Sequence, residues 1–346
     1  MKLLIFGGSV FLSRAVAEVG LARGHKVVCL SRGDSGSPPK GAHHVLADRS
    51  EETDPQAGTW TGLASKEWDA VIDVARMPSW VDTALAALKD RVRHWIFVST
   101  ISVYSDTSSP GGTPENTPTH PAAEEDLDDP SDPTAYGRNK IACEEAVRRA
   151  MGEACLIARA GLIAGPRDPS GRYTYWPERI SRGGKVLVPE PDDAPMQVID
   201  VRDLAEWLVT AAEERISGTY DAVPPSVPFH EFIAETSEGV SRVDPAGRED
   251  APPVRLVWAD PDALLSLDVR PWAGPRSLPL WIPGSEYAGS RDRDVSATLA
   301  AGLRTRPLAD TAEDTLRWVA NGSGVRKAGL TWHEEQDVIS SLGESS

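Results

Sequence analysis

The chain opens with a short apolar run that meets two glycines and then a helical pattern. Its first thirteen residues read MKLLIFGGSVFLS, with residues 3–6 as the apolar run and Gly7 and Gly8 directly after it. A buried strand, a glycine turn and a helix start form the first unit of a parallel α/β sheet, and the N–H groups of such a helix start suit a pyrophosphate. A full G-x-x-G-x-x-G spacing would need glycine where Val10 and Ser13 stand. The opening predicts a dinucleotide-binding unit with an altered turn.

Strand-like and helix-like segments alternate through the first 160 residues. The expected strands, rich in Val, Ile and Leu, are residues 2–6, 26–30, 43–46, 70–74, 95–99 and 155–159. The expected helices between them are residues 12–22, 80–89 and 135–150. Apolar strands joined through helices pair in parallel with right-handed crossovers. We therefore expect an α/β fold, a Rossmann-type doubly wound parallel sheet, with ligands at the carboxyl ends of the strands.

Beyond residue 160, Pro and Gly interrupt the pattern, as in PWAGPRSLPLWIPG at 271–284. Helical patterns return at residues 201–214, 294–301, 311–320 and 333–342. We expect a smaller, loop-rich substrate lobe made of residues 161–195 and 222–346. The Rossmann domain would take residues 1–160 and about 196–221.

Composition excludes several classes of function. The chain has 36 Lys and Arg against 52 Asp and Glu, a formal net charge of −16, whereas a nucleic-acid partner needs clustered cations. No apolar run reaches the roughly 18 residues of a membrane span, and the start lacks a signal-peptide pattern. We expect a cytoplasmic monomer or homodimer that binds a small molecule. Cys29, Cys143 and Cys155 have no metal-ligand spacing, so we expect buried thiols and no metal.

Three residues form a candidate catalytic set. Tyr136 and Lys140, in TAYGRNKIACEEAV, are four apart on an expected helix and project from one face. A neighbouring ammonium lowers the pKa of a phenol, and a lysine can also bond a ribose. Thr100 follows an expected strand in FVSTISVYSD. We interpret Tyr136 as the acid/base, Lys140 as its pKa tuner and Thr100 as an orienting hydroxyl.

These motifs resemble the extended short-chain dehydrogenase/reductases, the NAD-dependent epimerase/dehydratase family. YGRNK resembles the family's Y-x-x-x-K, and FVSTISVY resembles its strand-end hydroxyl motif. The family's adenine-contacting loop is similar to ADRS at 47–50, and its R-P-G-x-x-x-G-P stretch is similar to RAGLIAGP at 159–166. Its strand-to-helix return is similar to VIDVRDLAEW at 198–207. The opening is similar to bacterial members that read GGTRFLG. The resemblance implies an enzyme that transfers a hydride between NAD or NADP and a secondary alcohol.

The resemblance also implies the residues that contact ligands. Expected cofactor contacts are Gly7, Gly8, Ser9, Val10, Phe11, Leu12, Ser31, Arg32, Asp48, Arg49, Val74, Ala75 and Lys140. Expected substrate contacts are Arg76, Ile101, Ser102, Arg159, Tyr175, Trp176 and Trp281. Arg32 stands at the end of the second strand, where an acidic residue would favour NAD, and its charge tilts the prediction slightly to NADP.

Two departures from the family's sequence pattern reduce the number of substrate classes that fit. Ile101 and Ser102 stand where sugar dehydratases carry Asp-Glu, and Met196 stands where UDP-galactose epimerases place a diphosphate-binding arginine. A polyol such as a sugar, cyclitol or nucleoside therefore fits better than a nucleotide sugar. The net reaction stays open between epimerisation or dehydration through a transient ketone and simple ketone reduction. The alternative from another class is a non-catalytic relative that senses a cofactor or binds RNA.

Overall fold

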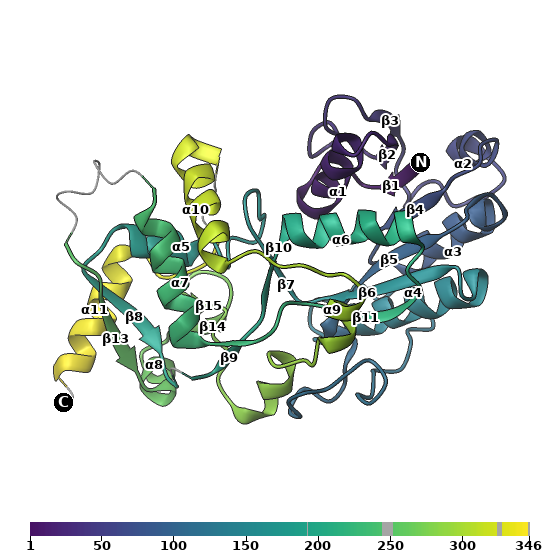
Figure 1. Cartoon of the computed structure of the whole chain (residues 1–346). Helices are drawn as coiled ribbons and strands as arrows, with labels where there is room; N and C mark the ends of the chain where they lie inside the picture. The colour runs from purple at the N-terminus through teal and green to yellow at the C-terminus, as the bar shows by residue number, and fades with distance from the viewer. Residues whose placement is uncertain (192, 244–251, 324–326, 345–346) are drawn as a thin grey trace. The chain divides into compact units, whose positions relative to one another are not determined.

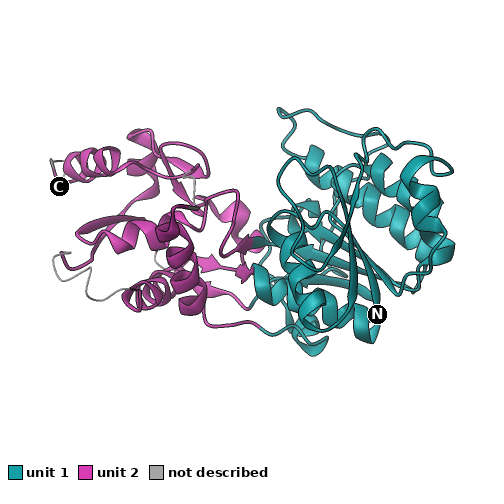
Figure 2. Ribbon diagram, turned by 90° about the horizontal axis from the view of Figure 1, so that it is seen from above, with its two compact units in different colours: residues 1–162, 201–224, 293–304 teal, residues 163–200, 225–292, 305–346 magenta. Residues whose placement is uncertain are grey.

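The computed structural model describes residues 1–191, 193–243, 252–323 and 327–344. The chain forms two compact units (Figure 2). Unit 1 consists of residues 1–162, 201–224 and 293–304, and unit 2 of residues 163–200, 225–292 and 305–346.

Unit 1 is built on a seven-stranded sheet whose strands pair in parallel in the order β11-β6-β5-β4-β1-β2-β3. The strands are β1 (Lys2–Phe6), β2 (Lys26–Ser31), β3 (His43–Leu46), β4 (Ala70–Asp73), β5 (Trp95–Thr100), β6 (Cys155–Ala160) and β11 (Gly218–Ala222). The order reverses between β1 and β4, which is the switch point where ligands of such sheets bind. The predicted doubly wound α/β fold is confirmed.

Helices cover both faces of this sheet (Figure 1). Helix α1 (Phe11–Ala22) packs with α6 (Val201–Glu214), while α3 (Pro78–Leu88) packs with α2 (Gly58–Ala64) and α4 (Ala135–Met151). Two short 3-10 helices, η1 (Lys89–Arg91) and η2 (Ile101–Val103), flank β5. The central strands β1, β4, β5 and β6 are mostly apolar and buried on both faces, whereas the edge strands β3 and β11 are partly exposed.

The sequence pattern predicts residues 293–304 in the smaller lobe and residues from about 196 in the Rossmann domain, whereas the structure groups 293–304 with unit 1 and 196–200 with unit 2. The segment 293–304 includes α9 (Ser296–Ala300). The Arg293 guanidinium donates to the Asp221 carboxylate at 2.8 Å, and the Thr298 hydroxyl donates to the Asp221 carbonyl at 2.9 Å. A buried ion pair that is far apart in sequence gives no periodic signal, so the pattern analysis missed this return.

Unit 2 combines short strand pairs with helices. The strand pairs are β7 (Leu162–Ala164) with β10 (Val198–Asp200), β9 (Pro195–Met196) with β12 (Val227–Pro228), β8 (Lys185–Pro189) with β13 (Arg255–Ala259), and β14 (Arg270–Trp272) with β15 (Ser277–Pro279). The helices are α5 (Tyr175–Ser181), α7 (Phe229–Ser241), α8 (Pro261–Ser266), η4 (Ser285–Ser290), α10 (Leu308–Trp318), η5 (Val319–Ser323) and α11 (Trp332–Glu344).

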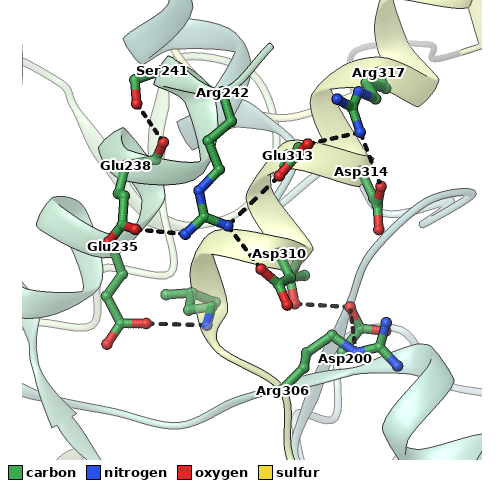
Figure 3. A network of polar contacts seen from close by, with 12 residues as sticks. Asp200, Glu235, Glu238, Ser241, Arg242, Arg306, Asp310, Glu313, Asp314 and Arg317 are labelled. Atoms are coloured by element: carbon green, nitrogen blue, oxygen red, sulfur yellow. Dashed lines mark hydrogen bonds and ion pairs between the residues drawn. The ribbon is translucent and has the colours of Figure 1, made fainter.

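Helices α7 and α10 form the frame of unit 2. Gly239 lets them approach closely, because a Cβ there would overlap the Ala309 carbonyl. On the surface, Arg242, which follows the end of α7, donates to Glu238 at 2.5 Å and to Asp310 of α10 at 2.8 Å (Figure 3). Exposed ion pairs of this kind contribute about 0–1 kcal/mol each, so the close packing at Gly239 carries more of the stability.

Candidate active site

The turn between β1 and α1 requires both of its glycines. Gly7 and Gly8 have φ angles of +118° and +106°, which side chains rarely adopt. A Cβ on Gly7 would come within 2.7 Å of the Ser13 hydroxyl, and one on Gly8 would overlap the Cys29 thiol. The Gly7 N–H donates to the Leu30 carbonyl at 2.8 Å and fastens the turn to β2. At the carboxyl end of β1 the turn therefore exposes its backbone without side chains from Gly7 and Gly8.

The remaining predicted residues of this turn, from Ser9 to Leu12, start helix α1. Val10 has an extended backbone with φ −127°, so this position does not need the glycine of the full motif. Its side chain caps none of the first N–H groups of α1, which suits a helix start that binds an anion. Phe11 has a φ angle of +41°, an uncommon and strained conformation for an aromatic residue.

Arg32, at the end of β2, is flanked by carboxylates. Its guanidinium lies 3.6 Å from Asp34 and 3.8 Å from Asp48. Hydrogen bonds from the Ser50 hydroxyl and N–H hold the pKa of Asp48 below its usual value, so this carboxylate stays charged. The Ser31 hydroxyl pairs with the His44 ring at 2.9 Å. Two negative groups beside Arg32 disfavour a 2′-phosphate at this position, which weighs against the predicted tilt to NADP.

The guanidinium of Arg49, a predicted cofactor contact, donates to the Asp73 carboxylate at 2.8 and 3.2 Å and to the Trp80 carbonyl at 2.6 Å. It also lies over the Phe6 ring, 4.3 Å from the centroid. These bonds join residues 47–50 to β4, and the contact of Arg49 with a cofactor stays a prediction.

Lys140 of α4 lies buried at the carboxyl ends of β4 and β5. Its ammonium donates to the carbonyls of Ala75, at 2.7 Å, and Val98, at 2.5 Å. Val74 and Ala75 follow β4, and the Ala75 N–H donates to Asp73. Burial lowers the pKa of Lys140 to about 8. An ammonium is costly to bury, and such groups are concentrated at functional sites.

Tyr136 stands one turn before Lys140 on α4 and is 47% exposed. Thr100 ends β5, where its hydroxyl accepts from the Ser102 N–H at 3.1 Å and donates to the Ser102 hydroxyl at 3.2 Å. Gly137, next to Tyr136, packs so closely on this turn that a Cβ would overlap the Ser102 carbonyl. The structure therefore brings the tyrosine's helical turn and the Thr100 turn together, as the sequence order predicts.

His120 lies at the same place and was missed by sequence reasoning. A Cβ on Gly137 would come within 3.3 Å of the His120 ring, and the His120 N–H donates to the Val103 carbonyl at 2.8 Å. This histidine is in the long segment between η2 and α4, where no periodic pattern or motif marks it. Only the fold places it beside the catalytic helix.

The guanidinium of Arg159, a predicted substrate contact, is bonded to a buried carboxylate. Arg159, on β6, is buried and donates to both oxygens of Glu144, at 3.0 and 2.8 Å. Glu144 accepts further bonds from Ser99 at 2.5 Å and from Arg148 at 2.9 Å. Arg159 also lies 4.9 Å from the centroid of the Tyr104 ring. The arginine of the RAGLIAGP stretch thus joins β6 to α4.

Of the other predicted substrate contacts in unit 1, Arg76 is 62% exposed and lies 4.0 Å from Asp128. Ser102 is exposed, and Ile101 packs beside a small cluster of Val103, Tyr104 and Ile141.

In unit 2, Tyr175 and Trp176 are core residues and not pocket walls, which corrects their predicted role. Both are essentially inaccessible, and Trp176 packs edge-to-face against Tyr175, Phe229 and Phe232. The Trp176 indole N–H donates to the Pro279 carbonyl at 2.9 Å. Trp281 differs from these residues, because it lines a cavity within unit 2.

Within the residues that the structure describes, no group of three or more His, Cys, Asp or Glu side chains is arranged to hold a metal ion. Across the same residues, no helix combines the length and apolar character that crossing a membrane requires. All three cysteines are buried free thiols, as predicted.

The fold, the glycine turn and the Tyr-x-x-x-Lys helix define an enzyme of the Rossmann-type short-chain dehydrogenase class. The model of the NAD dependent epimerase/dehydratase family matches residues 3–222, and the chain belongs to this family. Epimerase family protein SDR39U1 of Bos taurus is 23% identical over 242 residues, which are 65% of this chain and 75% of that protein.

Solved structures of the same fold cover nearly the whole chain. The Bordetella bronchiseptica enzyme WbmH, in complex with NAD+, has a TM-score of 0.63 at 18% identity, over 93% of this chain and 99% of that one. A putative epimerase from Burkholderia cenocepacia has a TM-score of 0.65 at 17% identity, over 92% and 98%. UDP-glucose 4-epimerase from Bifidobacterium longum, in complex with NAD+ and UDP, has a TM-score of 0.63 at 18% identity, over 94% and 100%.

Proposed function

We propose that this enzyme transfers a hydride between NAD(H) and a secondary alcohol or ketone of a polyol-type small molecule. The observation that carries the proposal is the buried ammonium of Lys140, held by the Ala75 and Val98 carbonyls at the carboxyl edge of the sheet. A lysine is rarely buried unless it is paired or functional. In the part of the chain that the structure describes, no carboxylate lies within ion-pairing distance of its Nζ.

The residues present fit a nicotinamide dinucleotide. The glycine turn has no side chains that would keep a pyrophosphate away from the backbone, and the start of α1, which the Val10 side chain does not cap, offers N–H groups to it. The N–H groups of Gly7 and Gly8 themselves are bonded to the Leu30 carbonyl and the Ser13 hydroxyl. Lys140 would hold the ribose next to the nicotinamide. When bound, the nicotinamide supplies or accepts the hydride.

The protein's own residues would then move the proton. In the oxidative direction the Tyr136 phenolate removes the hydroxyl proton of the substrate, and in the reductive direction the phenol returns it. In this mechanism the positive charge of Lys140 favours the phenolate form of Tyr136 over the phenol. Thr100, whose hydroxyl is set by Ser102, orients the substrate oxygen.

NAD(H) is favoured over NADP(H) by the surroundings of Arg32. Its charge is shared between Asp34 and Asp48, and these carboxylates would repel a 2′-phosphate. The complexes of WbmH and of the Bifidobacterium epimerase contain NAD+. These observations favour NAD(H), whereas the charge of Arg32 alone would favour NADP(H).

A polyol is favoured over a sugar nucleotide by Met196. This residue is buried on β9, paired in register with Val227 of β12. A buried thioether offers no charge to a diphosphate. A redox-neutral outcome, with the hydride returned to the substrate carbon, is supported by the epimerase names of the relatives.

The test incubates the protein and NAD+ with a panel of sugars, cyclitols and nucleosides. Nicotinamide absorbance reports net oxidation, mass spectrometry reports exchange of solvent deuterium at the carbon beside the alcohol, and chromatography of the products reports an epimer formed when the hydride returns to the same carbon. Tyr136→Phe should abolish every signal that the wild type gives, whereas Tyr287→Phe, at another half-exposed tyrosine, should keep them. Absence of all three signals across the panel, or full activity in Tyr136→Phe, would overturn the proposal.

A further inference from the structure

Three side chains of α4 form a stripe along one face of the helix. Tyr136, Lys140 and Glu144 are four residues apart, a spacing that places them one above the other. The Lys140 ammonium lies over the Phe97 ring of β5, 4.4 Å from its centroid, and donates to the Val98 carbonyl. The stripe therefore faces β5. Its first two residues belong to the candidate catalytic set, whereas Glu144 takes no part in the proposed proton transfer.

Glu144 accepts a hydrogen bond from β5. The Ser99 hydroxyl donates to its carboxylate at 2.5 Å, and the two residues are 3% and 0% exposed. Ser99 directly precedes Thr100, the predicted orienting hydroxyl. A hydrogen bond to a carboxylate is roughly twice as strong as one between neutral groups. This bond joins the strand end that carries Thr100 to the helix that carries Tyr136 and Lys140.

Two arginines supply the countercharge of Glu144. Arg159 of β6 donates to both of its oxygens, at 3.0 and 2.8 Å, and Arg148, one turn further along α4, donates at 2.9 Å. The Ser99 hydroxyl is neutral, so it is not needed to balance the charge. What the Ser99 bond adds is a direct link from the carboxylate to β5. A variant without this hydroxyl keeps Glu144 paired and should fold.

Close packing and the Lys140 bonds require the same placement of the helix. A Cβ on Gly137 would overlap the Ser102 carbonyl, so the first turn of α4 packs directly on the turn after β5. Further along, Lys140 donates to one carbonyl after β4 and one on β5. A slide of α4 by one residue moves it about 1.5 Å along its axis. Hydrogen-bond lengths vary by only about 0.5 Å, so such a slide would break the Lys140 and Ser99 bonds together.

We propose that Ser99 is a positioning residue that acts through Glu144 and holds α4 at one position along β5. The helix carries the Lys140 ammonium and the Tyr136 oxygen, so this position sets where both lie relative to Thr100. The expected effect on turnover rests on the hydride transfer proposed above. The expected effect on Lys140 needs no substrate, so the two proposals can fail separately.

The first test follows the titration of Lys140 by NMR on the full chain, with carbon-13 at the lysine ε-carbons and Lys140→Met to assign the signal. Burial lowers the pKa of Lys140 to about 8. A displaced helix would let water reach the ammonium, so Ser99→Ala should raise its proton affinity at least about tenfold. The charged and titratable groups around the ammonium stay unchanged in this variant: Asp73, Arg49, Cys143 and Glu144.

The second test is single-turnover hydride transfer at saturating NAD+, on a substrate from the polyol panel. Ser99→Ala should lower the rate about 10- to 100-fold, the loss expected when reacting groups are misplaced by about 1 Å. Ser99→Thr restores the hydroxyl and should recover most of the rate and the Lys140 titration. Ser277→Ala is the matched control, because Ser277 is a fully buried serine of unit 2 whose hydroxyl donates to the Gly274 carbonyl at 2.7 Å. It should change neither quantity.

The outcomes distinguish this proposal from the proposed function. If the wild type turns over no member of the panel, the hydride transfer is refuted, while the Lys140 titration still tests the position of the helix. An unchanged titration in folded Ser99→Ala, or the same change in Ser277→Ala, would overturn the positioning role. A wild-type rate in Ser99→Ala would also overturn it. Ser99→Cys, a weak donor of similar shape, gives the same comparison if Ser99→Ala does not fold.

Discussion

The Ser13 hydroxyl accepts a hydrogen bond from the Gly8 N–H, with 2.9 Å between the oxygen and the nitrogen. The same hydroxyl donates to the Val10 carbonyl at 2.9 Å. Ser13, which replaces the last glycine of the dinucleotide motif, thus stabilises the turn between β1 and α1 with two hydrogen bonds. The lack of the second and third glycines therefore does not by itself argue against a bound cofactor.

Ser13→Ala should lower both the stability of the protein and its affinity for the cofactor. The alanine keeps the Cβ but leaves the buried Gly8 N–H without its partner, which costs about 1–3 kcal/mol. The loosened turn should then hold NAD+ less tightly. Denaturant unfolding and calorimetry with NAD+ measure the two effects. If Ser13→Ala unfolds like the wild type, the bond does not support the turn.

Gly137→Ala should move the catalytic helix. The new methyl group would overlap the Ser102 carbonyl, so α4 must shift away from the Thr100 turn at a cost of about 1–3 kcal/mol. Turnover should fall even where the variant is fully folded, because Tyr136 moves with the helix. Gly62→Ala in α2 is the matched control: its Cβ would meet no atom within 4 Å, and it should stabilise the helix by up to about 1 kcal/mol. Equal behaviour of the two variants would contradict the close packing.

Tyr136→Phe should lower turnover by about 10²–10⁴-fold, the usual contribution of a positioned acid or base. Affinity for NAD+ should be nearly unchanged, because the ring stays and only the oxygen is lost. Thr100→Val should cost less, since it removes one orienting hydroxyl. Single-turnover hydride transfer on each variant, with a substrate found in the polyol panel, measures these losses. A larger loss in Thr100→Val than in Tyr136→Phe would reverse the assigned roles.

Lys140 should make stability depend on pH in a defined window. Its pKa is about 8 in the folded protein against 10.5 ordinarily, so between these values the unfolded chain binds more protons. The free energy of unfolding should therefore rise with pH from about 8 to about 10.5, relative to Lys140→Met. Denaturant unfolding of both proteins at several pH values isolates this difference, because other groups cancel. Parallel pH profiles would show that Lys140 titrates normally.

Six of the seven strands of the sheet were predictable because their signal is local. Six apolar runs with helical patterns between them specify parallel strands, and the positions of Thr100, Tyr136 and Lys140 follow from strand ends and helical spacing. The seventh strand, β11, was not predicted. What failed depends on side chains that meet across the chain. No sequence pattern indicates that Arg49 pairs with Asp73. Residue type also does not reveal whether a tryptophan such as Trp176 is buried in the core or lines a pocket.

The network at Glu144 gives the sharpest test of a residue that sequence reasoning assigned to the substrate. Glu144 is fully buried and holds Arg159 with two hydrogen bonds, Arg148 with one and the Ser99 hydroxyl with one. Glu144→Gln would leave the buried Arg159 without a countercharge, which costs about 3–5 kcal/mol. Arg159→Met should cost less, because Glu144 keeps Arg148 and Ser99.

Stability and turnover together decide the role of Arg159. If it is structural, Arg159→Met should lower the free energy of unfolding while the KM for substrate stays near the wild-type value at temperatures where the variant is folded. Arg148→Met, which removes a partner that is 39% exposed, is the matched control and should cost less than about 1 kcal/mol. Unfolding curves and substrate-saturation kinetics on the three variants measure both quantities. A variant at Arg159 that keeps wild-type stability but loses substrate affinity would restore the substrate contact and refute the structural role.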